Sequence, residues 1–394
     1  MAASRTIIAL VEERCIFYTY MPSRSFDAIV VGAGIVGAAC AEELARCGLS
    51  VAVCESDTVG GGATAAGMGH LAVMDDSEEQ FALTHYSQLL WRKLSGELPS
   101  DAEFLPCGAL WIAADAKEMA EVHRKQDFYT ARGVSAEVLD SRQLAEAEPN
   151  LRAGLAGGLL VAGDSVCYPP CVAHYLIAKA AQRGAMLFQP ARVAEIIASG
   201  VRLTNGNVVE SKFVVLATGA AARELIPDLP IRPRKGHLMI TDRYPAFIHH
   251  QLIELGYLKS AHAVQSNSVA FNIQPRATGQ LLIGSSRQFG SDDIAVEQSM
   301  LTQMLQRAAE YIPMLQQLSA IRAWTGHRAA TPDKLPLIGP CANRPNVYLA
   351  TGHEGLGIST SLATARLVAD QILHRESEIP TKPYLPQRSF DHHA

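Results

Sequence analysis

The sequence predicts an α/β protein in which a Rossmann-like domain is joined to a domain built on an antiparallel β-sheet. A glycine-rich turn at residues 32–37 stands between a buried strand and a helix, which is typical of the first domain. Alternating apolar and polar residues between 233 and 292 predict the second domain. The 394 residues allow two or three domains, and 48% hydrophobic against 19% charged residues excludes a mainly disordered chain.

The charge and the cysteine content indicate which kind of ligand the protein binds and in which cellular compartment we expect it. The 34 Lys and Arg against 39 Asp and Glu give a net charge of −5, and no basic run occurs, which argues against a nucleic-acid partner. We expect a small-molecule ligand, no transmembrane segment and no metal site. Residues 1–20 lack the pattern of a signal peptide and are expected to be an N-terminal extension without an assigned role. The eight cysteines are then most simply reduced thiols of a cytoplasmic protein.

The first motif is a strand, a turn and a helix at residues 27–48. In the turn GAGIVG, Gly32 makes the bend, Gly34 lets the backbone approach a pyrophosphate, and Gly37 lets the helix pack on the strand. The next strand, 49–54, ends at Glu55, whose carboxylate is placed to accept hydrogen bonds from a ribose. This fingerprint leaves NAD, FAD and S-adenosylmethionine open as ligands.

Three later segments narrow that choice. The small residues of the 60–70 loop, GGGATAAGMGH, let the backbone lie against a flat ligand. Residues 203–220 predict a hairpin turning at Asn205-Gly206, followed by a buried strand. Residues 346–361 predict a strand, a glycine-rich turn and a helix, whose N-terminus suits the N1/O2 edge of a reduced flavin. A flavin fits these segments better than a nicotinamide does.

Taken together, the motifs resemble the D-amino-acid oxidase family of flavoproteins. The resemblance covers about residues 26–380 and depends on GAGIVG with Glu55, GGGATAAGMGH, VVLATGA, and GHRAATPDKLPLIGP followed by ATGHEGLGIS. It implies a glutathione-reductase-type fold with non-covalent FAD, because Cys341 stands beyond the segment where one branch attaches its flavin. The residues implied to hold FAD are Gly32, Gly34, Ile35, Val36, Gly37, Glu55, Ser56, Gly62, Ala63, Thr64, Gly67, Met68, Gly69, His70, Val193, Thr218, Gly219, Gly326, Arg328, Gly352, His353, Glu354, Gly355, Leu356, Gly357 and Ile358.

Arg328 is the candidate for binding a substrate carboxylate. The resemblance implies this role, and the residues support it, because a guanidinium matches a carboxylate and the flanking segment is largely apolar. The alternative is a structural ion pair. Tyr257 is a candidate second contact to the substrate, although many tyrosines are simply half-buried. His70 is a candidate beside the flavin ring, with a packing role as its alternative.

Within the family, the closest resemblance is to catalytic flavin subunits of multi-subunit dehydrogenases, as in D-hydroxyproline dehydrogenase, opine oxidases and hydrogen cyanide synthase. It implies oxidation of a D-amino or D-imino acid, such as D-proline or cis-4-hydroxy-D-proline, to the imine by hydride transfer to flavin N5. Partner subunits would carry a [2Fe-2S] cluster and FMN. The alternatives are a stand-alone glycine, sarcosine or D-amino-acid oxidase using O₂, and a non-catalytic FAD-binding electron-relay subunit.

The order of the motifs predicts a discontinuous domain organisation. The FAD-binding domain is expected from three stretches, and the substrate domain from the stretches inserted between them. The stretches are 21–100, 151–232 and 323–382 for FAD, 101–150 and 233–322 for substrate, and a tail at 383–394. Amphipathic helices are predicted at 80–97 and 295–312.

Overall fold

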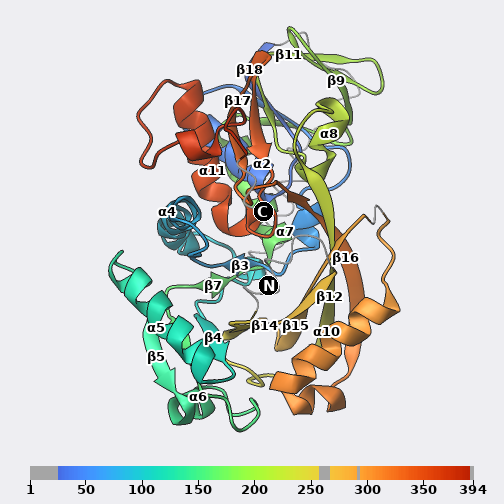
Figure 1. Ribbon diagram of the computed structural model, residues 1–394. Coiled ribbons are helices and arrows are strands. Elements are labelled where there is room, and N and C mark those ends of the chain that lie inside the picture. Colours follow the sequence, from blue (N-terminus) through green and yellow to red (C-terminus); the bar gives the residue numbers. More distant parts are fainter. Residues whose placement is uncertain (1–24, 257–266, 291–292, 391–394) are drawn as a thin grey trace.

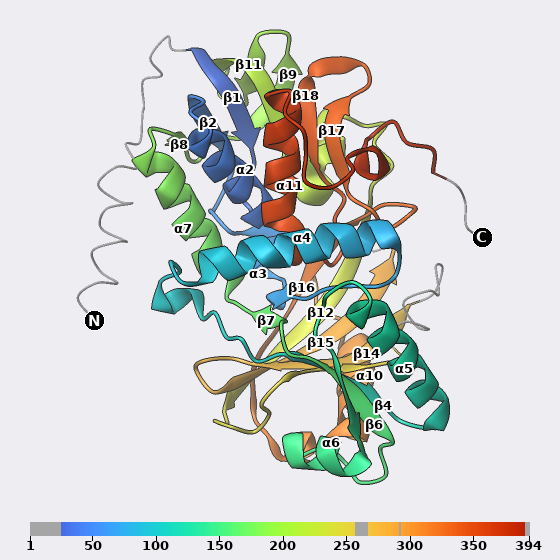
Figure 2. The same cartoon turned by 90° about the vertical axis from the view of Figure 1, so that its left-hand side faces the viewer.

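The computed structural model describes residues 25–256, 267–290 and 293–390, and Figures 1 and 2 show it from two sides. Two eight-stranded sheets lie one above the other, and a two-stranded sheet lies between them. The predicted α/β fold, a Rossmann-like domain beside a second β-sheet domain, is confirmed.

The upper sheet in Figure 1 has the strand order β17-β18-β11-β1-β2-β8, with β10 pairing to β11 and β9 to β10. Its centre is parallel, since β1 pairs with β2 and β11, and β11 with β18. Both faces of such a sheet are covered, so its strands are continuous apolar runs. The strands are β1 (Ser25–Val31), β2 (Val51–Cys54), β8 (Met186–Phe188), β9 (Val193–Ile197), β10 (Gly200–Leu203), β11 (Val208–Leu216), β17 (Leu337–Cys341) and β18 (Arg344–Thr351).

Helices α2 (Ile35–Arg46), α7 (Pro169–Gln182) and α11 (Gly357–Ile372) pack together on this sheet. Small buried residues of α2, including Ala38 and Ala41, allow the close approach. Helix α4 (Glu78–Ser95) lies across the molecule between the two sheets, as Figure 2 shows. Ser77 caps its N-terminus, because the Ser77 hydroxyl accepts a hydrogen bond from the Gln80 amide at 3.1 Å.

The lower sheet has the order β16-β12-β15-β14-β13-β4-β6-β5. Most of its pairs are antiparallel, but β13 runs parallel to β4, so the sheet is mixed rather than purely antiparallel as predicted. A long crossover separates these two strands in the chain, and such a connection permits a parallel pair. The strands are β4 (Ala109–Ala113), β5 (Glu137–Asp140), β6 (Gly157–Val161), β12 (Arg232–Arg243), β13 (Gln251–Glu254), β14 (Ser268–Pro275), β15 (Gln280–Phe289) and β16 (Ala320–Ala330).

The two faces of the lower sheet have different partners. Leu301 and Met304 of α10 (Gln298–Tyr311) pack with Phe271 and Ile273 of β14 and cover the outer face. The other face turns toward the upper sheet and carries α5 (Ala116–Thr130) near its β5 edge. The short α6 (Ser141–Ala147) joins the outer layer through Leu144. The inner face is therefore the one that can meet a ligand held by the upper sheet.

The chain passes from the upper to the lower sheet twice and returns twice. On its way it forms the small sheet of β3 (His70–Leu71) and β7 (Ser165–Val166). The predicted domain ranges remain a prediction. The ranges 151–232 and 323–382 grouped β6 and most of β16 with the FAD-binding domain, whereas strand pairing places both strands in the lower sheet. Both strands pair with neighbours in that sheet, β6 with β4 and β16 with β12.

Other predicted elements are confirmed. The helices expected at 80–97 and 295–312 are α4 and α10, and the hairpin turns at Asn205-Gly206 between β10 and β11. Gly206 has a φ of +87°, which explains the glycine at that turn. Within the described residues, no helix is long and apolar enough to cross a membrane.

Candidate active site

The glycine-rich turn after β1 is closely packed against the neighbouring strand. Gly32 has a φ of +97°, and a Cβ there would lie 2.8 Å from the Ala217 carbonyl oxygen. A Cβ on Gly37 would lie 1.9 Å from the Gly32 carbonyl oxygen, so only glycine lets α2 start this close to the turn. Gly34 precedes α2, and the Ile35 amide donates to Thr64 Oγ1 at 3.0 Å. The turn presents a helix N-terminus to any phosphate in front of it.

Glu55 lies at the end of β2, where the ribose of a dinucleotide is expected. Its Oε2 accepts a hydrogen bond from the Ala33 amide at 2.7 Å, and its Oε1 accepts one from the Asp57 amide at 2.8 Å. The Ser56 hydroxyl lies 3.3 Å from Oε1. These bonds fix the carboxylate beside the glycine-rich turn, and the residue is buried.

The 60–70 loop follows β2 and Glu55 and runs toward the lower sheet. It contains the short helix α3 (Gly62–Ala65), which includes Ala63 and Thr64. A Cβ on Gly67 would lie 2.7 Å from Ile358 Cδ1, and one on Gly326 of β16 would lie 2.3 Å from Ala66 Cβ. Met68 and Gly69 end the loop, where the Gln274 amide group donates to the Met68 carbonyl oxygen at 2.6 Å. The loop therefore joins the two sheets.

The remaining predicted positions lie on neighbouring elements of the upper sheet. Val193 begins β9 and is buried, and Thr218 with Gly219 follows β11. The Thr351 hydroxyl donates to the Gly219 carbonyl oxygen at 2.9 Å and so links the ends of β18 and β11. The turn after β18 holds Gly352, with a φ of +78°, and leads into α11. The residues of that turn and helix start are His353, Glu354, Gly355, Leu356, Gly357 and Ile358, and Val36 packs on them from α2.

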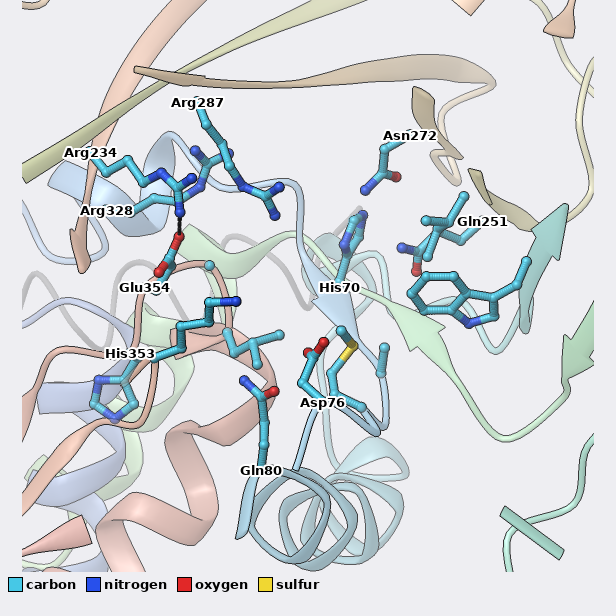
Figure 3. Close-up of a pocket in the computed structure, with 17 residues that line it drawn as sticks. His70, Asp76, Gln80, Arg234, Gln251, Asn272, Arg287, Arg328, His353 and Glu354 are labelled. Atoms are coloured by element: carbon cyan, nitrogen blue, oxygen red, sulfur yellow. Dashed lines mark hydrogen bonds and ion pairs between the residues drawn. The ribbon is translucent and has the colours of Figure 1, made fainter. Parts of the chain in front are cut away.

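A pocket opens between this turn and the inner face of the lower sheet (Figure 3). About 860 Å³ lies between its walls, part of it open to solvent. Segment 70–80 and the turn 353–356 form one side, and six strands of the lower sheet form the other. The lining residues from those strands are Trp111, Arg234, Gln251, Ile253, Asn272, Arg287 and Arg328.

Three arginines gather at one end of the pocket (Figure 3). Arg234 forms a buried ion pair with Glu354. Arg328 Nη1 donates to the Ser286 carbonyl oxygen at 2.9 Å, and its guanidinium lies over Gly236. Arg287 is the third arginine, from β15. With Lys334, the lining residues carry four basic groups against two acidic ones, which favours an anionic ligand group at this end.

His70 stands in the middle of the pocket, between the three arginines and the side-chain amides of Gln251 and Asn272 (Figure 3). Burial lowers the pKa of His70 to about 3, so the imidazole is neutral near pH 7. His353 differs, since its Nε2 lies 2.9 Å from the Thr364 hydroxyl, away from the pocket. Burial also lowers its pKa to about 3. A packing role explains His353, whereas His70 faces the ligand space.

Comparison with known proteins accounts for this arrangement. The family model for DAO, described as FAD dependent oxidoreductase, matches residues 27–371. The chain belongs to the DAO family of FAD-dependent oxidoreductases.

Several named proteins are similar to this chain over nearly its whole length. Glycine oxidase of Geobacillus kaustophilus is 29% identical over 377 residues, covering 91% of this chain and 96% of that protein. Hydrogen cyanide synthase subunit HcnC of Pseudomonas aeruginosa is 27% identical and covers 93% and 97%, respectively. The crystal structure of glycine oxidase from Geobacillus kaustophilus has a TM-score of 0.83 at 28% identity, covering 93% of this chain and all of that one. L-proline dehydrogenase from P. horikoshii shares the fold, with a TM-score of 0.82 at 24% identity and 93% and 98% coverage.

The residues present fit the cofactor of the DAO family. The closely packed Gly32 and Gly37 let α2 begin directly after the turn, and the buried Glu55 is fixed at the end of the next strand, as the dinucleotide fingerprint requires. The turn 352–357 faces the pocket from the far end of the sheet. These are separate stretches of sequence at the carboxyl ends of neighbouring parallel strands, where ligands of open α/β sheets bind. The individual FAD contacts remain predictions.

The sequence motifs predict many of the residues on the flavin-side wall of the pocket but only Arg328 on the wall formed by the lower sheet. Tyr257 lies outside the described residues. Arg234, Arg287, Gln251 and Asn272 were not predicted, although they line the pocket with Arg328. A polar residue within a buried strand could have indicated them. In Gln251-Leu252-Ile253, for example, Leu252 enters the core, while Gln251 and Ile253 line the pocket.

Proposed function

We propose that the protein oxidises the CH–NH bond of a D-amino or D-imino acid, such as D-proline or cis-4-hydroxy-D-proline, to the imine. The observation that carries this proposal is the position of Arg328. Its guanidinium lines the pocket from the lower sheet, and a Cβ on Gly355 of the flavin-side turn would lie 3.8 Å from its Nε. A carboxylate bound there is held close to the predicted flavin-binding turn.

Arg328 would bind and orient the substrate carboxylate. The hydrogen bond from its Nη1 to the Ser286 carbonyl oxygen holds the guanidinium in the pocket wall. A fixed cation positions the substrate α-carbon at a constant distance from the turn 353–356. When bound, the flavin supplies at N5 the acceptor for the hydride that leaves this α-carbon.

His70 would contribute a neutral contact. Its imidazole carries no charge at neutral pH, so it does not repel an amine that enters the pocket. Its Nε2 has no hydrogen-bond partner among the described residues and is available to a polar substrate atom. As the C=N bond forms, the α-carbon gives up a hydride and the substrate nitrogen releases a proton to solvent, so the proposal gives Arg328 a positioning role and assigns no side chain as the base.

The relatives support the substrate class. Glycine oxidases and L-proline dehydrogenase are named for amino acids, and hydrogen cyanide synthase subunit HcnC is named as a subunit. The preferred acceptor is a partner subunit carrying a [2Fe-2S] cluster and FMN. Within the described residues no group of three or more His, Cys, Asp or Glu side chains could hold a metal ion.

The second candidate is a stand-alone oxidase that passes electrons to O₂. The glycine oxidases among the relatives favour it. Anaerobic addition of glycine, sarcosine, D-proline or cis-4-hydroxy-D-proline should bleach the yellow protein. Colour that returns quickly when air is admitted identifies an oxidase, whereas persistent bleaching identifies a dehydrogenase that needs partners.

Arg328→Ala tests the catalytic assignment against a non-catalytic electron-relay subunit. Losing two charge-assisted hydrogen bonds, at roughly 1.5 kcal/mol each, should lower kcat/KM by about 100-fold or more. Arg322→Ala is the matched control, because Arg322 is an exposed arginine on the same strand. Unchanged bleaching rates in Arg328→Ala with every amine would contradict the proposal.

A further inference from the structure

Two primary amides line the pocket at the end away from the arginines (Figure 3). Gln251 lies on β13 and Asn272 on β14, which pair antiparallel with Ile253 opposite Asn272. Gln251 and Ile253 project from the same face of β13, so both amides share the inner face of the sheet. Gln251 is fully buried, and Asn272 is only 5% exposed.

Three of the four polar atoms of these amides have no hydrogen-bond partner in the part of the chain that the structure describes. Neither Oε1 nor Nε2 of Gln251, nor Oδ1 of Asn272, has a hydrogen bond among the described residues. Gln274, the next inner-face residue of β14, has one partner: its Nε2 donates to the Met68 carbonyl oxygen at 2.6 Å, while its Oε1 has none among the described residues. Buried amide groups are normally hydrogen-bonded, and leaving them unpaired destabilises the fold. The missing partners are therefore expected from whatever fills the pocket.

The chemistry of the unpaired atoms restricts that occupant. The amides offer oxygens that accept and an NH₂ group that donates. A carboxylate only accepts and an ammonium only donates, whereas a hydroxyl group or a carboxamide does both. Rotating either amide by 180° exchanges its oxygen and nitrogen, but each side chain still offers both kinds of atom.

The sheet separates this neutral end from the charged end. In the order β16-β12-β15-β14-β13, the pocket-lining residues change from Arg328, Arg234 and Arg287 to Asn272 and Gln251. A substrate whose carboxylate lies at the arginines would direct the rest of its structure toward the amides. His70 stands between the two ends and adds a further neutral polar atom.

We propose that Gln251 and Asn272 select a substrate that carries a hydroxyl group on its side chain or ring. This inference rests on the proposed function and names its substrate class more narrowly. It identifies both amides as specificity-determining residues. A site that hydrogen-bonds a substrate hydroxyl discriminates strongly against the analogue without it, because the site's own polar groups then stay unpaired.

The test compares substrates that differ by one hydroxyl group. The holoenzyme should oxidise cis-4-hydroxy-D-proline with a kcat/KM roughly 10- to 100-fold above that for D-proline. The near-isosteric variants Gln251→Met and Asn272→Leu should reduce this ratio to about 3-fold or less. Gln280→Met is the matched control, because Gln280 lies on β15 outside the pocket and should leave the ratio unchanged.

Binding gives a readout that does not depend on turnover. Tetrahydrofuran-2-carboxylate has a ring oxygen in place of the N–H group, so it cannot form the imine. Its 4-hydroxy derivative should bind the wild type more tightly by a similar factor, measured as Kd by calorimetry, and the variants should lose this difference. If the wild type oxidises or binds both members of each pair equally, the inference is wrong while the proposed function stands. If no amine reduces the flavin, the proposed function itself fails.

Discussion

Gly236→Ala would move the guanidinium of Arg328 without changing any charge. Gly236 lies on β12, and a Cβ built there would be 2.6 Å from Arg328 Nη1 and 2.8 Å from its Cζ and Nη2. Favourable contacts between such atoms begin at about 3.4 to 3.5 Å, so the guanidinium must shift by roughly 0.8 Å. The hydrogen bond to the Ser286 carbonyl oxygen, now 2.9 Å long, would stretch or break.

That shift sets the size of the expected effect. A misplacement of about 1 Å in a substrate-positioning group can cost 100-fold in rate, so we expect kcat/KM to fall by about 10- to 100-fold. Stability should change little, because the clash involves the end of a flexible side chain. A strand Gly→Ala change compatible with the backbone can even stabilise by about 0.4 to 1 kcal/mol. The variant should therefore lose activity with an unchanged or higher Tm.

The assay combines three measurements on the holoenzyme: kcat/KM, the Kd of a non-oxidisable carboxylate, and Tm. Gly96→Ala is the matched control, since a Cβ there meets nothing within 4 Å. A variant with wild-type kcat/KM and Kd would refute the role given to Arg328. A fall in activity accompanied by a lower Tm would also refute the reasoning, because it would mean general disruption of the sheet.

Two further predictions concern the cofactor site and pH. Gly37→Ala should prevent FAD retention, because its Cβ would lie 1.9 Å from the Gly32 carbonyl oxygen. The purified variant should lack the yellow flavin absorbance, and a yellow variant of normal Tm would contradict this prediction. Burial raises the pKa of Asp164 to about 8, so the folded state keeps a proton that the unfolded state loses near 3.8, and stability falls as pH rises through that interval. Asp164→Asn removes this pH-dependent loss of stability, so the Tm of the variant relative to that of the wild type should rise between pH 5 and pH 8. Parallel Tm profiles of the two proteins would contradict the prediction.

The parts of the site that are contiguous in sequence could be predicted from it. The turn 32–37 and Glu55 belong to one strand–helix–strand unit, and the spacing alone locates them. Gly326 and the 60–70 loop were also predicted, yet their contact through Ala66 was not, since it depends on how β16 passes the loop. Sequence patterns predict local structure, whereas contacts between segments distant in sequence are known only from the structure.

The arginine and amide ends of the pocket illustrate what local patterns leave undetermined. Arg234, Arg287 and Arg328 are distant in sequence and meet because β12 lies between β16 and β15. Their residue types do not reveal that order. Gln251 and Asn272 look like ordinary polar residues of alternating strands, and only the register that pairs β13 with β14 shows that they face the same space.

The double passage of the chain between the sheets limits how the protein can be divided. Neither sheet comes from one continuous stretch, because β4 to β6 and β12 to β16 are separated by strands of the other sheet. A fragment cut at any single point would leave one sheet with strands missing and unpaired edges exposed. Split reporters or shortened versions of this enzyme would consequently need both fragments to associate during folding, and neither half should accumulate as a soluble product by itself.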